Sequence, residues 1–140
     1  MIRYGKLTQN AIAAMSRLAE VYPQGVRLSS GDIAEARQIP KTLAAKLLTR
    51  LSQAGLVGGA PGPGGGYSLA KPPGEISLLD IVAVFERTED RLMCPFGPNW
   101  CGNGSPCPMH EKLAGMAEDF ETFLRDTTLD VFCRDTPCQH

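Results

Sequence analysis

Apolar residues recur every three or four positions between residues 8 and 22. This spacing predicts a helix with one buried stripe, and we expect Thr8 to cap its amino end. Pro23 and Gly25 should end the helix, because neither residue continues an α-helix well. The stripe consists of Ile12, Met15, Leu18, Ala19 and Tyr22.

Two further helices are predicted between residues 29 and 54. Ser29 is followed three residues later by Asp32, which is the spacing of a capping box, so a short helix should begin there. The next helix begins at Pro40, since proline suits the first position of a helix, and ends before Gly55. Two helices separated by a tight turn form a helix-turn-helix.

The second helix of this pair has one apolar face, formed by Leu43, Ala44, Leu47, Leu48 and Leu51. Its opposite face carries Thr42, Ala45, Lys46, Thr49 and Gln53, flanked by Lys41 and Arg50. Small and polar side chains bordered by cations are what a helix needs to enter the major groove of DNA. A solvated face of an ordinary helical bundle is the alternative, and this pattern alone does not separate the two.

Residues 56–57 and 67–69 predict two short strands, and the glycine- and proline-rich run between them predicts a hairpin loop. A strand, a loop and a strand after a helix-turn-helix form a wing. The run lacks the lysine and the Ser/Thr of a P-loop, which argues against nucleotide binding. Ser77 and Asp80 then predict the capped start of another amphipathic helix.

A long helix with a broad apolar stripe is predicted over residues 109–126. A stripe of this width must be covered, either by the rest of the chain or by a second copy in an antiparallel helix pair. The stripe consists of Leu113, Met116, Ala117, Phe120, Phe123 and Leu124.

Three cysteines and a histidine lie close together in the run CPFGPNWCGNGSPCPMH, as Cys94, Cys101, Cys107 and His110. Thiolates and imidazole suit zinc, iron–sulfur clusters or copper rather than calcium or magnesium. Three cysteines and one histidine are also a common structural zinc set, but no pair here has the tight C-x2-C spacing of most zinc modules. Oxidation of the thiols without any metal is the third possibility.

The composition also indicates the cellular compartment to expect. A chain of 140 residues can bury a core without disulfides. It has no apolar run long enough to span a membrane, and its first ten residues lack the apolar core of a signal peptide, so we expect a cytoplasmic protein with no membrane partner. In that reducing compartment, five cysteines favour metal ligands or redox thiols over disulfides.

The charges are divided unevenly along the chain. Residues 1–70 carry eight Lys/Arg and three Asp/Glu, whereas residues 71–140 carry six and twelve. A positive front half beside a negative rear half is typical of a nucleic-acid-binding head with a separate assembly module. The chain shows no nucleophile–base pair and no paired acidic motif, so we predict that it is not an enzyme.

The run AGLVGGAPGPGGGYSLAKPPGEISLLDIV, the helix-turn-helix before it, the spaced cysteines and the later FLRDTTLDVF together resemble one known family. This is the Rrf-type family of winged-helix repressors that includes the iron–sulfur regulator IscR and the nitric-oxide-responsive regulator NsrR. The resemblance extends to about Phe132. It implies a mostly α fold with a small β wing, that is, a winged helix-turn-helix plus a long C-terminal dimerisation helix.

The resemblance also implies a function. Such proteins are homodimers that bind palindromic sites in double-stranded promoter DNA, and a cluster that senses iron, redox state or nitric oxide controls this binding. Cys94, Cys101 and Cys107 would hold the cluster, with a 2Fe–2S form favoured over a 4Fe–4S form and zinc as the alternative. His110 would be the fourth ligand, because Gln9 stands where some members place an aspartate ligand.

Two other functions remain open. A cluster-independent winged-helix regulator would use a structural zinc or a thiol redox switch instead. An electron-transfer protein would leave the helix-turn-helix and the wing unexplained.

Four segments are expected by resemblance: a winged helix-turn-helix domain (1–90), a cluster-binding loop (91–108), a dimerisation helix (109–130) and a disordered tail (131–140). The tail contains Cys133, Cys138 and His140, which could resolve an oxidised thiol or bind a metal. The residues expected to meet phosphates or bases are Arg3, Lys6, Arg27, Lys41, Thr42, Ala45, Lys46, Thr49 and Arg50. Gly58, Gly59, Ala60 and Pro61 stand where family members commonly have a cation, so we expect weaker discrimination by the wing.

Overall fold

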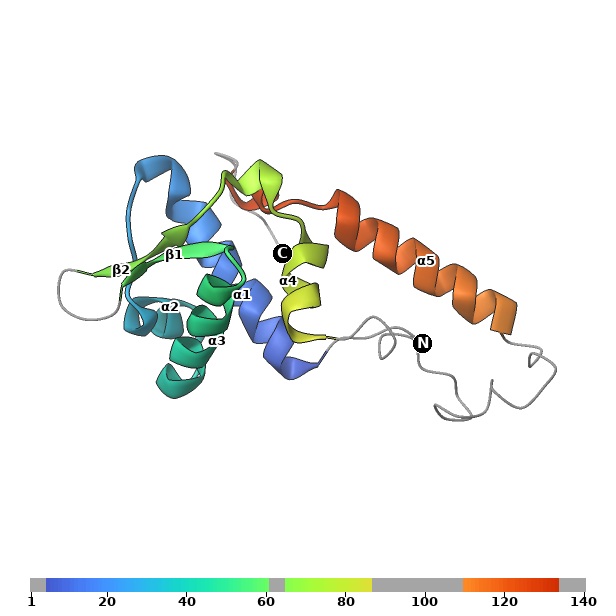
Figure 1. The fold of residues 1–140 in the computed structure, drawn as a ribbon, viewed down its shortest axis with the longest axis horizontal. Helices are drawn as coiled ribbons and strands as arrows, with labels where there is room; N and C mark the ends of the chain where they lie inside the picture. The colour runs from blue at the N-terminus through green and yellow to red at the C-terminus, as the bar shows by residue number, and fades with distance from the viewer. Residues whose placement is uncertain (1–4, 61–64, 87–109, 134–140) are drawn as a thin grey trace.

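The computed structural model describes residues 5–60, 65–86 and 110–133, and shows a mostly helical chain with one small sheet (Figure 1). The helices are α1 (Lys6–Val21), α2 (Ser30–Arg37), α3 (Lys41–Gln53), α4 (Leu78–Phe85) and α5 (His110–Asp126). Three short 3-10 helices are η1 (Tyr22–Gln24), η2 (Pro73–Glu75) and η5 (Leu129–Phe132). Strands β1 (Val57–Ala60) and β2 (Gly66–Leu69) pair antiparallel. The predicted mostly α fold with a small β wing is confirmed.

Two helices begin at the capping boxes that the sequence predicts. At α2, the Asp32 amide donates to the Ser29 hydroxyl at 3.0 Å, and the Ser29 amide donates to the Asp32 carboxylate at 3.1 Å. Ser77 and Asp80 form the same reciprocal pair at α4. Each pair satisfies two amides that have no partner within the helix, so the side chains fix where the helix starts.

The predicted cap of α1 is wrong. The helix begins at Lys6 after Gly5, so Thr8 lies inside its first turn. Thr8 is fully buried, and its hydroxyl donates to the carboxylate of Glu86 at 3.2 Å. The Thr8 hydroxyl therefore donates to a residue 78 positions further along the chain instead of capping the start of α1.

The core lies where α1, α3 and α4 meet. The buried face of α3 is formed by Ala44, Leu47, Leu48 and Leu51, as predicted. A leucine that is fully removed from water contributes about 2 to 3 kcal/mol relative to an exposed one, so this face holds α3 firmly against the domain. The largest fully buried apolar side chains are Met15, Leu18, Ile33, Leu47, Leu48, Leu51, Ile76, Ile81, Val82, Leu124 and Leu129.

The wing is tied to the chain segment that precedes α2. Beyond the β1–β2 pairing, the Leu28 amide donates to the Tyr67 carbonyl at 3.0 Å and the Tyr67 amide donates back at 2.7 Å. Within the wing, Gly59 faces Tyr67 and has a φ of 147°, and a Cβ placed there would lie 1.9 Å from the Gly66 carbonyl oxygen. Only glycine fits this position.

Gly59→Ala should therefore destabilise the protein by about 3 kcal/mol, because it adds both a backbone strain and a clash with a backbone atom. The free energy of unfolding in urea measures this. Gly58→Ala is the matched control, since nothing lies within 4 Å of a Cβ at that position, and we expect a change below about 0.5 kcal/mol. Equal effects of the two substitutions would contradict the geometry of this wing.

Helix α5 extends away from the wing and from α2 and α3, with its C-terminal end beside α4 (Figure 1). Leu124 near that end is buried in the chain's own core. The chain after it pairs with the start of α4, since the Leu78 amide donates to the Thr127 carbonyl and the Leu129 amide donates to the Ile76 carbonyl, each at 2.9 Å. Residues 131–133 of the predicted tail continue this packing through η5 against α1. These three residues are therefore not a separate tail, and residues 134–140 lie outside the described residues.

Candidate nucleic-acid interface

The outward face of α3 is polar and exposed. Lys41, Thr42, Ala45, Lys46 and Thr49 are all exposed there, as the sequence predicts. The Thr49 hydroxyl donates to the Ala45 carbonyl at 2.9 Å, which leaves its methyl group on the surface of the helix. A firmly packed helix with two cations on its open face can lie in a major groove.

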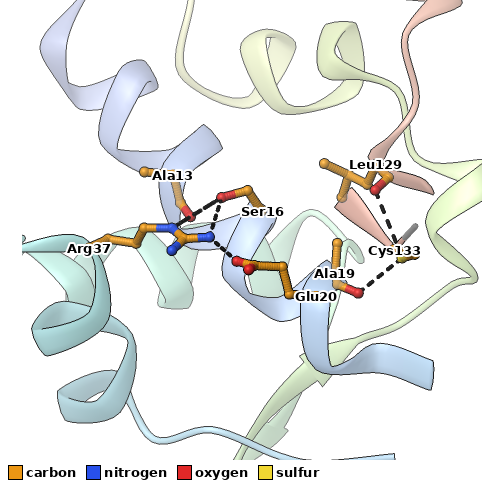
Figure 2. A network of polar contacts seen from close by, with 7 residues as sticks. All are labelled: Ala13, Ser16, Ala19, Glu20, Arg37, Leu129 and Cys133. Carbon is orange, nitrogen blue, oxygen red and sulfur yellow. Dashed lines mark hydrogen bonds and ion pairs between the residues drawn. The ribbon is translucent and has the colours of Figure 1, made fainter. Parts of the chain in front are cut away.

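Helix α2 is fixed to α1 by the side chain of Arg37 (Figure 2). Its guanidinium donates to the Ala13 carbonyl at 3.2 Å and to the Ser16 hydroxyl at 3.1 and 3.3 Å, and it forms an ion pair with Glu20. The turn that follows has Gln38 in the left-handed region and Ile39 buried. The position of α3 is thus set by contacts at both ends of the turn.

A cation lies beside the wing although the wing strands contain none. Arg27 is exposed in the segment before α2, and its Cβ is 3.1 Å from the position that a Cβ on Gly66 would occupy. The Arg27 side chain starts beside the first residue of β2 because the segment before α2 pairs with that strand, a pairing between segments far apart in the chain.

The structure places Arg50 differently from the other predicted DNA contacts. Its guanidinium donates to the Val84 carbonyl at 2.9 Å and lies 4.6 Å from the centre of the Phe85 ring. Both partners belong to α4, so the side chain is directed along the body of the domain. Lys6 is exposed at the start of α1, and Arg3 lies outside the described residues.

The apolar stripe predicted on α5 divides between two environments. Leu124 is 1% exposed and Phe120 packs against the core, whereas Met116 is 58% and Phe123 is 52% exposed. The Phe120 and Phe123 rings lie 6.1 Å apart between their centres. Ala117 is half-buried, and the side chain of Leu113 is outside the described set. The open apolar surface of α5 is therefore centred on Met116 and Phe123.

The predicted metal ligands fall largely beyond the described ranges. Cys94, Cys101 and Cys107 lie in the undescribed residues 87–109, and His110 is described only as the first residue of α5. In the part of the chain that the structure describes, no three His, Cys, Asp or Glu side chains gather to hold a metal ion. The segment that contains these cysteines, residues 87–109 (the cysteine segment), follows Glu86, the first residue after α4.

Cys133 is the one cysteine whose surroundings the described residues include. Its thiol donates to the Ala19 carbonyl at 3.0 Å (Figure 2). Partial burial raises the pKa of this thiol, and the nearby Asp130 carboxylate raises it further. A thiol that stays protonated is a poor nucleophile and a poor metal ligand, which argues against Cys133 resolving an oxidised thiol.

Comparison with known proteins identifies relatives of the whole arrangement. Residues 4–135 match the family model described as Rrf2, an iron-dependent transcriptional regulator. The chain is 31% identical over 120 residues to the transcriptional regulator IscR of Pectobacterium carotovorum, covering 86% of this chain and 72% of that protein. It is 29% identical over 132 residues to IscR of Vibrio atlanticus, covering 93% and 76%.

Among solved structures, CymR of B. subtilis, titled the global cysteine regulator, superposes with a TM-score of 0.76. The two chains share 22% sequence identity, and the match covers 93% of this chain and 95% of CymR, so this likeness concerns the fold. The relatives are described as regulators rather than enzymes, in agreement with the prediction. No helix in residues 5–60, 65–86 and 110–133 is long and apolar enough to cross a membrane.

Proposed function

The chain belongs to the Rrf2 family of iron-dependent transcriptional regulators, and from that premise we propose that it is a dimeric repressor whose operator binding is controlled by an iron–sulfur cluster. The observation that carries the DNA-binding part is the outward face of α3, where Lys41 and Lys46 border small and polar side chains. Arg27, beside β2, would contact the DNA backbone next to the major groove that α3 enters. Lys6 and the undescribed Arg3 are further candidate phosphate contacts.

The exposed apolar surface of α5 supports a homodimer. Met116 and Phe123 present large apolar side chains to water on a helix whose Leu124 and Phe120 already pack on the core. A second copy of the same helix, lying antiparallel, covers both surfaces and relates two copies of α3 by a two-fold axis. Two half-sites in a palindromic operator require that symmetry.

The donor set of the cysteine segment fits an iron–sulfur cluster. Cys94, Cys101 and Cys107 supply three thiolates, and His110 supplies an imidazole at the first position of α5. When bound, a cluster supplies a redox-active and iron-dependent group whose potential depends on charge and solvent exposure. A 2Fe–2S form is preferred in this proposal. The three cysteines lie between α4 and α5 in the sequence and His110 is the first residue of α5, so the chain itself joins the ligands to both the DNA-binding domain and the proposed dimer helix.

The second candidate function keeps the DNA binding and replaces the cluster. The same three thiols and histidine form a structural zinc set, or the thiols act directly as a redox switch. Three cysteines and one histidine suit zinc as well as an iron–sulfur cluster, which keeps this alternative open. Zinc protein is colourless and iron–sulfur protein is brown, so the absorption spectrum of anaerobically purified protein separates them.

Lys46→Gln tests the docking face of α3. A duplex is first selected from a random-sequence library with the wild-type protein, and the dissociation constant is then measured from 50 to 200 mM salt. Loss of one phosphate contact from each subunit, two per dimer, should weaken binding at least tenfold and reduce the slope of log K against log salt by about 1.8.

The control is Arg125→Gln, which removes one exposed positive charge from the last turn of α5. It should leave both the affinity and the slope nearly unchanged. Equal behaviour of the two variants would rule out α3 as the surface that meets DNA.

A further inference from the structure

The last turn of α4 contacts α3, the helix that we propose enters the major groove (the recognition helix). The Arg50 guanidinium, on α3, donates to the Val84 carbonyl at 2.9 Å and stacks on the Phe85 ring with a 4.6 Å separation from its centre. The Val84 carbonyl is near the end of α4, where carbonyls lack partners within the helix, and a cation is favourable there. Arg50 therefore satisfies two groups of α4 at once.

The next residue connects the same turn to α1. The Glu86 carboxylate accepts the Gly5 amide at 2.6 Å and the hydroxyl of the buried Thr8 at 3.2 Å. Gly5 is the residue at which α1 begins. Residues 84–86 thus contact both the start of α1 and the C-terminal half of α3.

These contacts compete with a role of Arg50 at the DNA backbone. A guanidinium that reaches a phosphate must leave the Val84 carbonyl and the Phe85 ring, and the carbonyl would then lose its partner. Lys46 and Lys41 make no such contact with α4 among the hydrogen bonds and ion pairs of the described residues. All three cations of α3 are exposed, but among the described residues only Arg50 is bonded to α4.

We propose that Arg50 is a positioning residue: it holds α3 against the last turn of α4 and so sets the angle at which the recognition helix meets the major groove, without touching DNA. This inference rests on the proposed DNA-binding function. Phe85, a side chain of α4 that is packed against the core, would then contribute to operator affinity. A tilt of α3 misplaces every base contact along the helix, so the effect on affinity is larger than that of one lost contact.

The test measures affinity and salt dependence for Arg50→Met, Phe85→Leu and the double variant on the selected duplex. Arg50→Met keeps the apolar stem, and Phe85→Leu keeps the bulk but removes the aromatic face. We expect each single variant to bind about five- to tenfold more weakly, with an unchanged salt slope. The double variant should bind no more weakly than Arg50→Met alone, because both substitutions break the same contact.

Three outcomes would overturn the proposal. A salt slope reduced by about 1.8 in Arg50→Met, which loses one charge from each subunit of the dimer, with Phe85→Leu binding normally, would make Arg50 a phosphate contact. Unchanged affinity in both variants, with only a lower melting temperature, would make the contact purely structural. Additive losses of affinity in the double variant would show that Arg50 and Phe85 act independently. Arg125→Met controls for the lost charge, and circular dichroism confirms that each variant is folded at the assay temperature.

Failure of the proposed function itself gives a different result. If the wild-type protein selects no duplex from the library, DNA binding fails and the positioning role fails with it. If the wild-type protein selects a duplex and only the variants behave unexpectedly, the positioning role alone is rejected.

Discussion

We expect Cys101→Ser to remove the iron from the protein: purified without oxygen, the wild-type chain should be brown and the variant nearly colourless, with less than about a tenth of the wild-type iron. The reason is that a neutral hydroxyl replaces one of three thiolates that donate to iron. A serine oxygen is a harder and far less acidic donor than a cysteine sulfur. Iron content and the visible absorption spectrum measure this directly.

The matched control is the same substitution at Cys133. That thiol donates to the Ala19 carbonyl, and its raised pKa keeps it protonated, so Cys133→Ser should retain the colour and the iron. A serine hydroxyl can donate to the same carbonyl, which preserves the fold at this point. Equal iron in the two variants would remove Cys101 from the ligand set, and zinc in place of iron in the wild type would favour the structural-zinc alternative.

We expect Phe123→Asp to convert the proposed dimer to a monomer and to reduce operator affinity by roughly a hundredfold or more. A carboxylate placed in the middle of an apolar helix pair is buried twice in a two-fold dimer, once from each copy. A monomer engages one half-site only, and the loss of the second contact removes the gain from linked binding. Sedimentation velocity gives the mass of the species, and titration of the selected duplex gives the affinity.

The choice of Phe123 follows from the structure. Phe120 packs against the chain's own core, so a charge there would disturb folding as well as dimerisation. Phe123 is half exposed in the single chain and can be changed with less effect on the fold. Thr122→Asp, which adds the same charge at an exposed neighbouring position off the apolar stripe, is the control and should remain dimeric. A Phe123→Asp protein that still sediments as a dimer would place the interface elsewhere.

Interactions between residues close in sequence made much of the winged helix-turn-helix domain predictable. The capping pairs at Ser29 and Ser77 act within three residues, and the leucines of α3 repeat at the helical period, so each could be read from neighbours in the chain. The wing was predictable because Gly59 and the residues around it exclude a helix. In each case the determining interactions are local.

The errors and omissions involve partners that are distant in sequence. The Thr8 hydroxyl is bonded to Glu86, and the Arg50 guanidinium is bonded to a carbonyl 34 residues away. The sequence placed Arg50 on α3 and Thr8 at the start of α1, but neither assignment shows which residue approaches from elsewhere in the chain. Arg27 next to the wing is a third example, since the segment before α2 adds to the sheet edge through Leu28.

The stripe on α5 shows a different limit. Its period predicts one continuous apolar face, but the structure uses Leu124 and Phe120 for the chain's own core and leaves Met116 and Phe123 exposed. Periodicity gives the width of a face and not the identity of what covers it. The ligand set of the cysteine segment has the same status, since spacing gives the donors and the described residues do not include their geometry.

We propose that the group held by Cys94, Cys101 and Cys107 controls the binding of DNA. The decisive measurement is the dissociation constant of the selected duplex for anaerobically isolated protein and for the same preparation after its iron has been removed with a chelator. We expect the two values to differ by about tenfold or more for the wild type and not at all for Cys101→Ser. Identical affinities of the iron-containing and iron-free wild-type protein would contradict this proposal.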